Sequence, residues 1–505
     1  MLFVLLLMLF LFGLLAVAAM IVLPRFARLD PIALIGDSLT GYGANSDRHQ
    51  NAAQLPTPWD PMGDANRAIE AIPFEDRSYP LIAEAAAMLD AAGARDRLGP
   101  MPGEEGWEET ADWVRSDQAQ AIIAVLVEAV GKPAAGFPLS DVEGPIWDAA
   151  RERHGLQPIG GTPTPQPPML DVVLPAVGQS RLAVRLLIAD ARIGLQDRDL
   201  ERFVTGIETV YGMTLHGYGP NWLIQQLVHA ATIAYAGGVL QDVLTEHPGL
   251  LTEEAAARID RVLSAVASNG TLDLDSSGKA MFMEDQIRRF VDDRGVYNVS
   301  GAVNAVNALN NAAGGPGPSS VVTEAINADL LASFRESQRW ARAARDATRA
   351  PYEPMTGFAT AIEAWENEPD SIPGRIGRLI FGITMPSWPS AVGVNRLSEQ
   401  RFTALRVALA AHRHRLRHGD PPQGLADIDD DLVYFDPVDG FTGGPMQFRW
   451  RDGAPFVYTY GPDKDDDGGR HTFDEDGEPW RSISDELLEA APDGDWVLFP
   501  GADDG

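Results

Sequence analysis

The sequence predicts a mainly α-helical protein with a transmembrane helix at its N-terminus and a small α+β module at its C-terminus. Three observations predict this fold. Residues 1–23 are an unbroken apolar run, residues 169–311 carry repeated apolar stripes at helical spacing, and residues 396–505 place one long amphipathic helix before short β-type segments. Between them we expect a juxtamembrane region of helices and loops (24–168) and a linker, arginine-rich helix and connector (312–395).

Composition limits the possible functions before any motif is considered. The 505-residue chain is long enough for two or three domains, and its net charge is −32. So acidic a chain has no basic surplus to neutralise phosphates, which argues against a nucleic-acid partner. Because it contains no cysteine, disulfides, thiolate nucleophiles and cysteine-ligated zinc are excluded.

The N-terminal run contains no charged residue and exceeds the length of about 20 residues that spans a membrane. A signal peptide cut near Ala16-Val17-Ala18 is the alternative. The run continues past Ala18 and no basic segment precedes it, so we expect a membrane anchor. Arg25 and Arg28 would keep the body cytoplasmic by the positive-inside rule. We nevertheless expect a single-pass inner-membrane protein with an extracytoplasmic body, because a calcium-rich exterior suits so acidic a chain.

An apolar run at residues 32–35 leads into Gly36-Asp37-Ser38-Leu39. This block resembles the nucleophile block of GDSL (SGNH) hydrolases, a family that also needs Asp-x-x-His near the C-terminus. None of the nine histidines has an acidic residue three positions earlier. Without a base, Ser38 is a weak nucleophile at neutral pH. We therefore predict that Ser38 lies in a juxtamembrane turn and is not catalytic, with an ester hydrolase as the alternative.

The central chain is predicted to be helical, beginning with residues 78–93 and 109–131, each closed by a glycine. Four further amphipathic segments follow between residues 170 and 292, with Thr252 placed as an N-cap. Short connections between such helices predict antiparallel hairpins stacked side by side, which offer a surface for protein partners. An arginine-rich helix is expected over about residues 322–349.

In the C-terminal module, Phe402, Leu405, Leu409 and Leu416 share one helical face, and Gly419 stops the helix. We predict strands at residues 429–437, 446–452 and 456–462, the last two joined by a turn at residues 452–455. The module is then one long helix packed on a small antiparallel sheet.

The order of motifs over residues 396–470 carries a resemblance. It reads helix, H-G-x-x-P, G-L, D-P-x-x-G, F-R-W, F-V-Y-T-Y-G-P-D and D-D-G-G. This order resembles the C-terminal domain of the major pseudopilin of type II secretion, whose Y-S-x-G-x-D-G loop holds calcium. The whole chain also resembles large uncharacterised planctomycete-type proteins with an anchor, a helical body and this ending. The pilin methylation motif, with its glutamate inside the apolar helix, is absent from residues 1–23. The resemblance therefore implies a shared module rather than a pilin subunit.

A calcium loop is predicted directly after the third strand segment. Asp463, Asp465 and Asp467 alternate before Gly468, and calcium takes six to eight oxygen ligands. Counting Asp463 as position 1 of an EF-hand places Gly468 at position 6 and Asp474 at position 12. No helix leads into the loop, so a free-standing calcium loop is expected rather than an EF-hand. A solvated acidic turn is the alternative.

Two weaker metal patterns accompany it. The first has helices predicted on both sides but unusual residues at positions 2 and 9, and its ligands would be Asp273, Asp275, Ser277 and Glu284. The second is a histidine group, His412, His414 and His418, on the basic helix. His414 and His418 lie one turn apart and could bind zinc, but no third ligand is evident, so we interpret them as solvated.

These observations together predict a membrane-anchored cell-envelope protein that acts as a non-enzymatic scaffold and is stabilised by calcium at its C-terminus. The sequence holds no complete catalytic set. The alternatives are the Ser38 ester hydrolase and an accessory component of a type II secretion-like pseudopilus.

Overall fold

The computed structural model describes residues 61–138, 140, 144–160, 175–216, 223–272, 343, 346–354, 388–473 and 483–500. Several predicted features lie outside these residues. They are the anchor at residues 1–23, Ser38, the weaker calcium pattern with Asp273, Asp275, Ser277 and Glu284, position 12 of the main loop at Asp474, and most of the arginine-rich helix.

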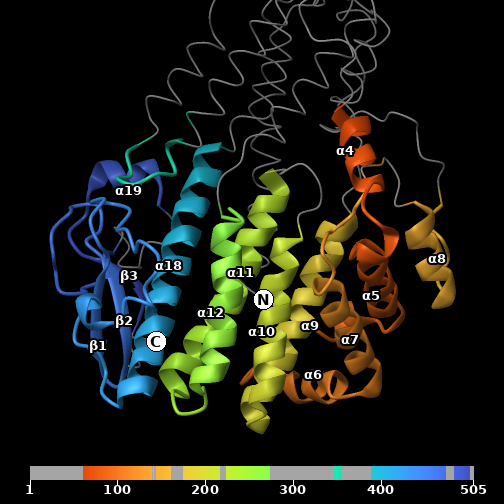
Figure 1. Cartoon of the computed structure of the whole chain (residues 1–505), viewed down its shortest axis with the longest axis horizontal. Helices are drawn as coiled ribbons and strands as arrows, with labels where there is room; N and C mark the ends of the chain where they lie inside the picture. Colours follow the sequence, from red (N-terminus) through yellow and green to blue (C-terminus); the bar gives the residue numbers. More distant parts are fainter. Residues whose placement is uncertain are drawn as a thin grey trace, which may run out of the picture.

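The described chain is mostly helical with one small antiparallel sheet, which confirms the mainly α-helical class and the small sheet of the C-terminal module. Its longer helices stand side by side in a row that ends at the sheet (Figure 1). The helices are α4 (Pro61–Glu70), α5 (Tyr79–Ala91), α6 (Trp107–Val114), α7 (Asp117–Val130), α8 (Pro145–Arg153), α9 (Pro175–Asp197), α10 (Leu200–Leu215), α11 (Leu223–Glu246), α12 (Glu253–Ser268), α18 (Trp388–His418) and α19 (Asp485–Ala490).

Local caps set several helix ends, and one of them corrects the sequence prediction. Gly93 closes α5 with a φ of +61°, as expected of a helix-ending glycine. The prediction of a single helix over residues 109–131 is wrong, because this segment is divided between α6 and α7. Ser116 adopts an extended conformation between them, and its hydroxyl accepts a hydrogen bond from Ala119 N at 3.3 Å. A serine that caps a new helix ends the preceding one.

Helices α9 to α12 pack against one another, with α10 in contact with α9, α11 and α12. Small residues allow α9 and α10 to approach closely. A Cβ atom on Gly194 would lie 2.8 Å from Phe203 N, and one on Gly206 would lie 3.1 Å from Ala191 Cβ. The predicted N-cap of α12 is confirmed, since Thr252 Oγ1 accepts a hydrogen bond from Ala255 N at 3.2 Å.

Helix α11 is apolar because it is a core helix. Within the described residues, its segment Gln225–Glu246 is the one helix long and apolar enough to cross a membrane. However, α11 packs on α9, α10 and α18. Residues Val239, Leu240 and Val243 on it are essentially inaccessible to solvent. The apolar character of α11 is therefore what its place in the core requires.

The C-terminal sheet consists of β1 (Gln447–Arg451), β2 (Ala454–Thr459) and β3 (Trp496–Phe499), antiparallel in the order β1-β2-β3. The predicted hairpin is confirmed as a two-residue turn. Asp452 and Gly453 both have positive φ angles, of 52° and 84°, as a type I′ turn requires. The strand predicted over residues 429–437 is wrong, since that segment forms turns, and the third strand is β3 instead.

Helix α18 begins at Trp388, earlier than predicted, and lies between the helical row and the sheet (Figure 1). It contacts α11 and α12 on one side and β2 and β3 on the other. Its middle turns are therefore buried all round, and Ala404, Val407, Ala408 and Ala411 are completely inaccessible to solvent. The helical row and the sheet share one continuous hydrophobic core through this helix.

His412 lies on this buried helix and is itself inaccessible to solvent. Burial, reinforced by the charge of Arg415, lowers the pKa of its imidazole to about 4. An unfolded histidine has a pKa of about 6.5, so below that pH the unfolded chain binds a proton that the folded chain does not. The free energy of unfolding therefore falls by about 3 kcal/mol as the pH falls from about 6.5 towards 4, because His412 must stay neutral in the folded chain.

We expect His412→Leu to make the loss of stability in acid shallower than in the wild type. Some loss of stability in acid will remain in this variant, because burial also lowers the pKa of His229 to about 4. The measurement is the urea midpoint across this pH range, with His247→Gln, at an exposed position, as the control. The same acid dependence in His412→Leu and the wild type would contradict this account.

Candidate metal centres

The predicted calcium loop follows β2 directly, so a strand rather than a helix leads into it. Gly468, at the sixth position, has a φ of +74°, and the next glycine, Gly469, has a φ of +87°. A Cβ atom on Gly469 would collide with the ring of Phe456 in β2. These two glycines let the loop turn back tightly over the sheet, which brings its aspartates together.

Four aspartates converge at this loop. One carboxylate oxygen from each of Asp463, Asp465, Asp467 and Asp493 lies within 4.8 Å of the others. Asp493 comes from the turn before β3, and Gly494 N in the same turn donates a hydrogen bond to Asp463 Oδ2 at 2.9 Å. The structure thus brings together three of the sequence-predicted ligands. It adds Asp493, which sequence reasoning missed although Asp493-Gly494-Asp495 is itself an acidic turn.

Two carboxylate oxygens at the loop are buried, one from the loop itself and one from Asp495 beside it. Asp467 Oδ2 and Asp495 Oδ1 are buried without a hydrogen-bond partner. Burial raises the pKa of Asp495 to about 6, against the opposing effect of the hydrogen bond that Gly469 N donates to it. Burial also raises the pKa of Asp463. Both shifts show that negative charge is costly here, so a bound cation would stabilise the ionised carboxylates.

An arginine already supplies part of the missing positive charge. Arg470 Nη2 donates hydrogen bonds to Asp467 Oδ1 at 2.5 Å and to Asp493 Oδ2 at 2.7 Å. About half of the Arg470 side chain is exposed to solvent. A metal ion that used these two aspartates would compete with this guanidinium, which can move into solvent.

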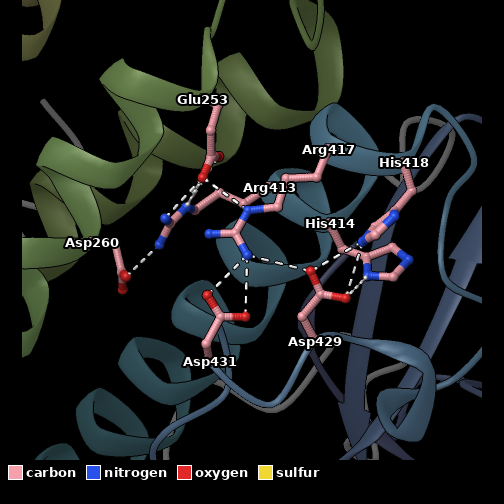
Figure 2. A network of polar contacts seen from close by, with 8 residues as sticks. All are labelled: Glu253, Asp260, Arg413, His414, Arg417, His418, Asp429 and Asp431. Atoms are coloured by element: carbon pink, nitrogen blue, oxygen red, sulfur yellow. Dashed lines mark hydrogen bonds and ion pairs between the residues drawn. The ribbon is translucent and has the colours of Figure 1, made fainter.

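A second group of metal-binding side chains lies at the end of α18 (Figure 2). His414 Nδ1 and His418 Nε2 each lie 3.1 Å from Asp429 Oδ1. The interpretation of the histidines as solvated is therefore wrong for His414, whose side chain is only 15% exposed, whereas His418 is 51% exposed as expected. His412 does not join them, because it faces the core. The third ligand that the sequence lacked is Asp429, from the loop where a strand was expected.

Arginines connect this group to α12, as Figure 2 shows. Arg413 Nη1 donates to Asp260 Oδ2 at 2.7 Å, and its Nη2 donates to Glu253 Oε1 at 2.9 Å. Burial raises the pKa of Asp260, while Arg413 opposes that rise. Arg417 donates to Glu253, Asp429 and Asp431 at 2.9–3.3 Å from a more exposed position.

Compared with protein-family models, curated proteins and solved structures, the chain matches none of them.

The Arg413 ion pairs give a stability prediction. Arg413→Met leaves Asp260, which is 8% exposed, without its direct ion pair, so we expect the free energy of unfolding to fall by about 3 kcal/mol. Arg417→Met is the matched control on the same helix. Its more exposed pairs should contribute only about 1 kcal/mol or less. Urea unfolding in EDTA measures both, and equal losses would contradict a special role for Arg413.

Proposed function

We propose that this chain is a single-pass inner-membrane protein whose extracytoplasmic body is a non-enzymatic scaffold stabilised by calcium at its C-terminus. The observation that carries the proposal is the convergence of Asp463, Asp465, Asp467 and Asp493. These residues come from two segments that are distant in sequence. An ion held between them would fasten the loop after β2 to the turn before β3.

Calcium fits this group better than other biological cations do. The available ligands are carboxylate oxygens, which suit a hard cation, and a loop of alternating aspartates bent by glycine resembles known calcium loops. Exposure of Asp465 and Asp493 leaves room for water ligands, which calcium accepts. Such an open site suits a weak affinity, with a Kd of roughly 10⁻⁴–10⁻³ M, as in extracellular modules.

The scaffold part of the proposal rests on the row of helices. Side-by-side packing of α9 to α12 gives an extended surface on which protein partners could bind. The acidic composition disfavours nucleic acid as a partner. The apolar, uncharged residues 1–23 supply the proposed anchor, the membrane partner of the chain.

Two alternatives from the sequence remain distinct from this proposal. An ester hydrolase would use Ser38, and its hydrolysis of p-nitrophenyl acetate would be lost in Ser38→Ala. An accessory pseudopilus component would share the C-terminal module and copurify with a secretion apparatus. Neither outcome is expected of a calcium-stabilised scaffold.

We expect the full-length chain to bind one calcium ion at this loop, with an affinity in the range given above. Asp465→Ala should weaken calcium binding at least tenfold, because it removes one of the four carboxylate ligands. The Asp465 side chain is exposed, so its removal should leave the core intact. Asp436→Ala, an exposed aspartate on another loop, is the matched control and should bind as the wild type does. Titration calorimetry with calcium and with magnesium measures these affinities.

Arg470 provides an independent check of the same site. If calcium uses Asp467 and Asp493, Arg470→Gln should tighten calcium binding severalfold, because the competing guanidinium is removed. Equal calcium affinities in the wild type, Asp465→Ala and Arg470→Gln would show that calcium does not bind here. The loop would then be an acidic turn neutralised by arginine.

We also expect the full-length chain to sediment with membranes and to resist extraction by alkaline carbonate. Deleting residues 2–23 should release it into the soluble fraction. Protease protection in intact spheroplasts should report which side of the membrane the body occupies. Recovery of the intact, uncleaved chain in the soluble fraction without detergent would contradict the anchor.

A further inference from the structure

We propose that His414, His418 and Asp429 form a binding site for a transition-metal ion of the Zn²⁺ type, separate from the calcium loop. Two of the three ligands lie one turn apart on α18, and the third lies on the loop that leads from α18 towards the sheet. One ligand atom from each residue lies within 4.8 Å of the others. The proposal does not depend on the function proposed above.

The distances within the group are close to those of a metal site. Each of the two histidine nitrogens lies 3.1 Å from Asp429 Oδ1. Ligand atoms bound to zinc at 2.0–2.1 Å and at tetrahedral angles lie about 3.3 Å apart. Only small movements of side chains are therefore needed to place an ion between them. The ion would replace the protons that the histidines now donate to the carboxylate.

The ligand types favour zinc over calcium. Imidazole nitrogens suit Zn²⁺, Cu²⁺ and Ni²⁺, whereas calcium requires oxygen ligands. Two neutral histidines and one carboxylate leave a fourth tetrahedral position, which water can fill. His418 is 51% exposed, so that position can face solvent.

A supporting residue already orients the carboxylate. Arg417 Nη1 donates to Asp429 Oδ2 at 3.3 Å, and the same nitrogen is held by Asp431 at 2.9 Å. This bond engages Asp429 Oδ2, which also lies 3.1 Å from His418 Nε2, while Oδ1 lies 3.1 Å from His414 Nδ1. Residues that orient a ligating carboxylate in this way tune metal affinity. An ion at this position would fasten the loop before β1 to the end of α18.

The test uses the purified full-length chain and adds zinc chloride in competition with a chromogenic chelator. We expect one equivalent to bind, and cobalt in its place should give the visible absorption of a tetrahedral site. His418→Gln and Asp429→Asn should each weaken zinc binding at least tenfold. Both substitutions keep a hydrogen-bonding side chain, and circular dichroism in EDTA will show whether the fold is retained.

Two control variants make the result specific. His247→Gln removes an exposed histidine elsewhere and should bind zinc as the wild type does. Asp465→Ala should lose calcium affinity but keep its zinc affinity, which separates the two sites. The proposal is overturned if the wild type does not bind one equivalent, or if His418→Gln and Asp429→Asn bind zinc as tightly as His247→Gln does.

Discussion

The packing of α18 on both of its sides is the constraint on which the rest of the C-terminal half depends. A helix covered by α11 and α12 on one side and by β2 and β3 on the other is expected to present mainly small or apolar residues. Its middle turns are mostly of this kind, with Ala404, Ala408 and Ala411, and they also bury Arg406 and His412. The sheet thus packs on a helix that is also part of the helical row, and an unfolding event in one would expose the core of the other.

The charged end of α18 is stabilised by elements from both sides. Cationic side chains at a helix C-terminus and acidic ones at a helix N-terminus are favoured by the helix dipole. Arg413 and Arg417 near the end of α18 meet Glu253 in the first turn of α12, so both preferences are satisfied by one contact. On the other side, Asp429 and Asp431 come from the loop towards β1. In a chain of net charge −32, this basic patch is therefore a structural device that aligns two helices and a loop.

Local signals in the sequence predicted much of the local structure, although the Ser116 cap that divides α6 from α7 was missed, and they failed where distant segments meet. The N-cap at Thr252 and the two-residue turn at Asp452 could be predicted, because each depends on a few adjacent residues. The strand expected over residues 429–437 failed because its aspartates pair with α18, and β3 takes the place in the sheet. The candidate sites show the same limit. Asp493 joins the aspartates of the predicted calcium loop, and Asp429 joins the histidines. Each comes from a segment distant in sequence, which periodicity and spacing do not detect.

The two candidate metal groups share one electrostatic arrangement and differ in ligand chemistry. In each, an arginine contacts a carboxylate that a metal would use, Arg470 at the loop and Arg417 at the helix end. At the loop, four aspartates exceed the single guanidinium charge, so the group keeps an excess of negative charge and favours a hard divalent cation. At the helix end, the four acids Glu253, Asp260, Asp429 and Asp431 outnumber Arg413 and Arg417 by two, and of these acids only Asp429 is grouped with the two histidines. There the imidazole nitrogens must supply the affinity, which restricts the group to metals that bind nitrogen well. Under the two proposals, net charge and ligand type therefore favour different ions for two groups that lie on either side of the β1–β2 hairpin in the sequence.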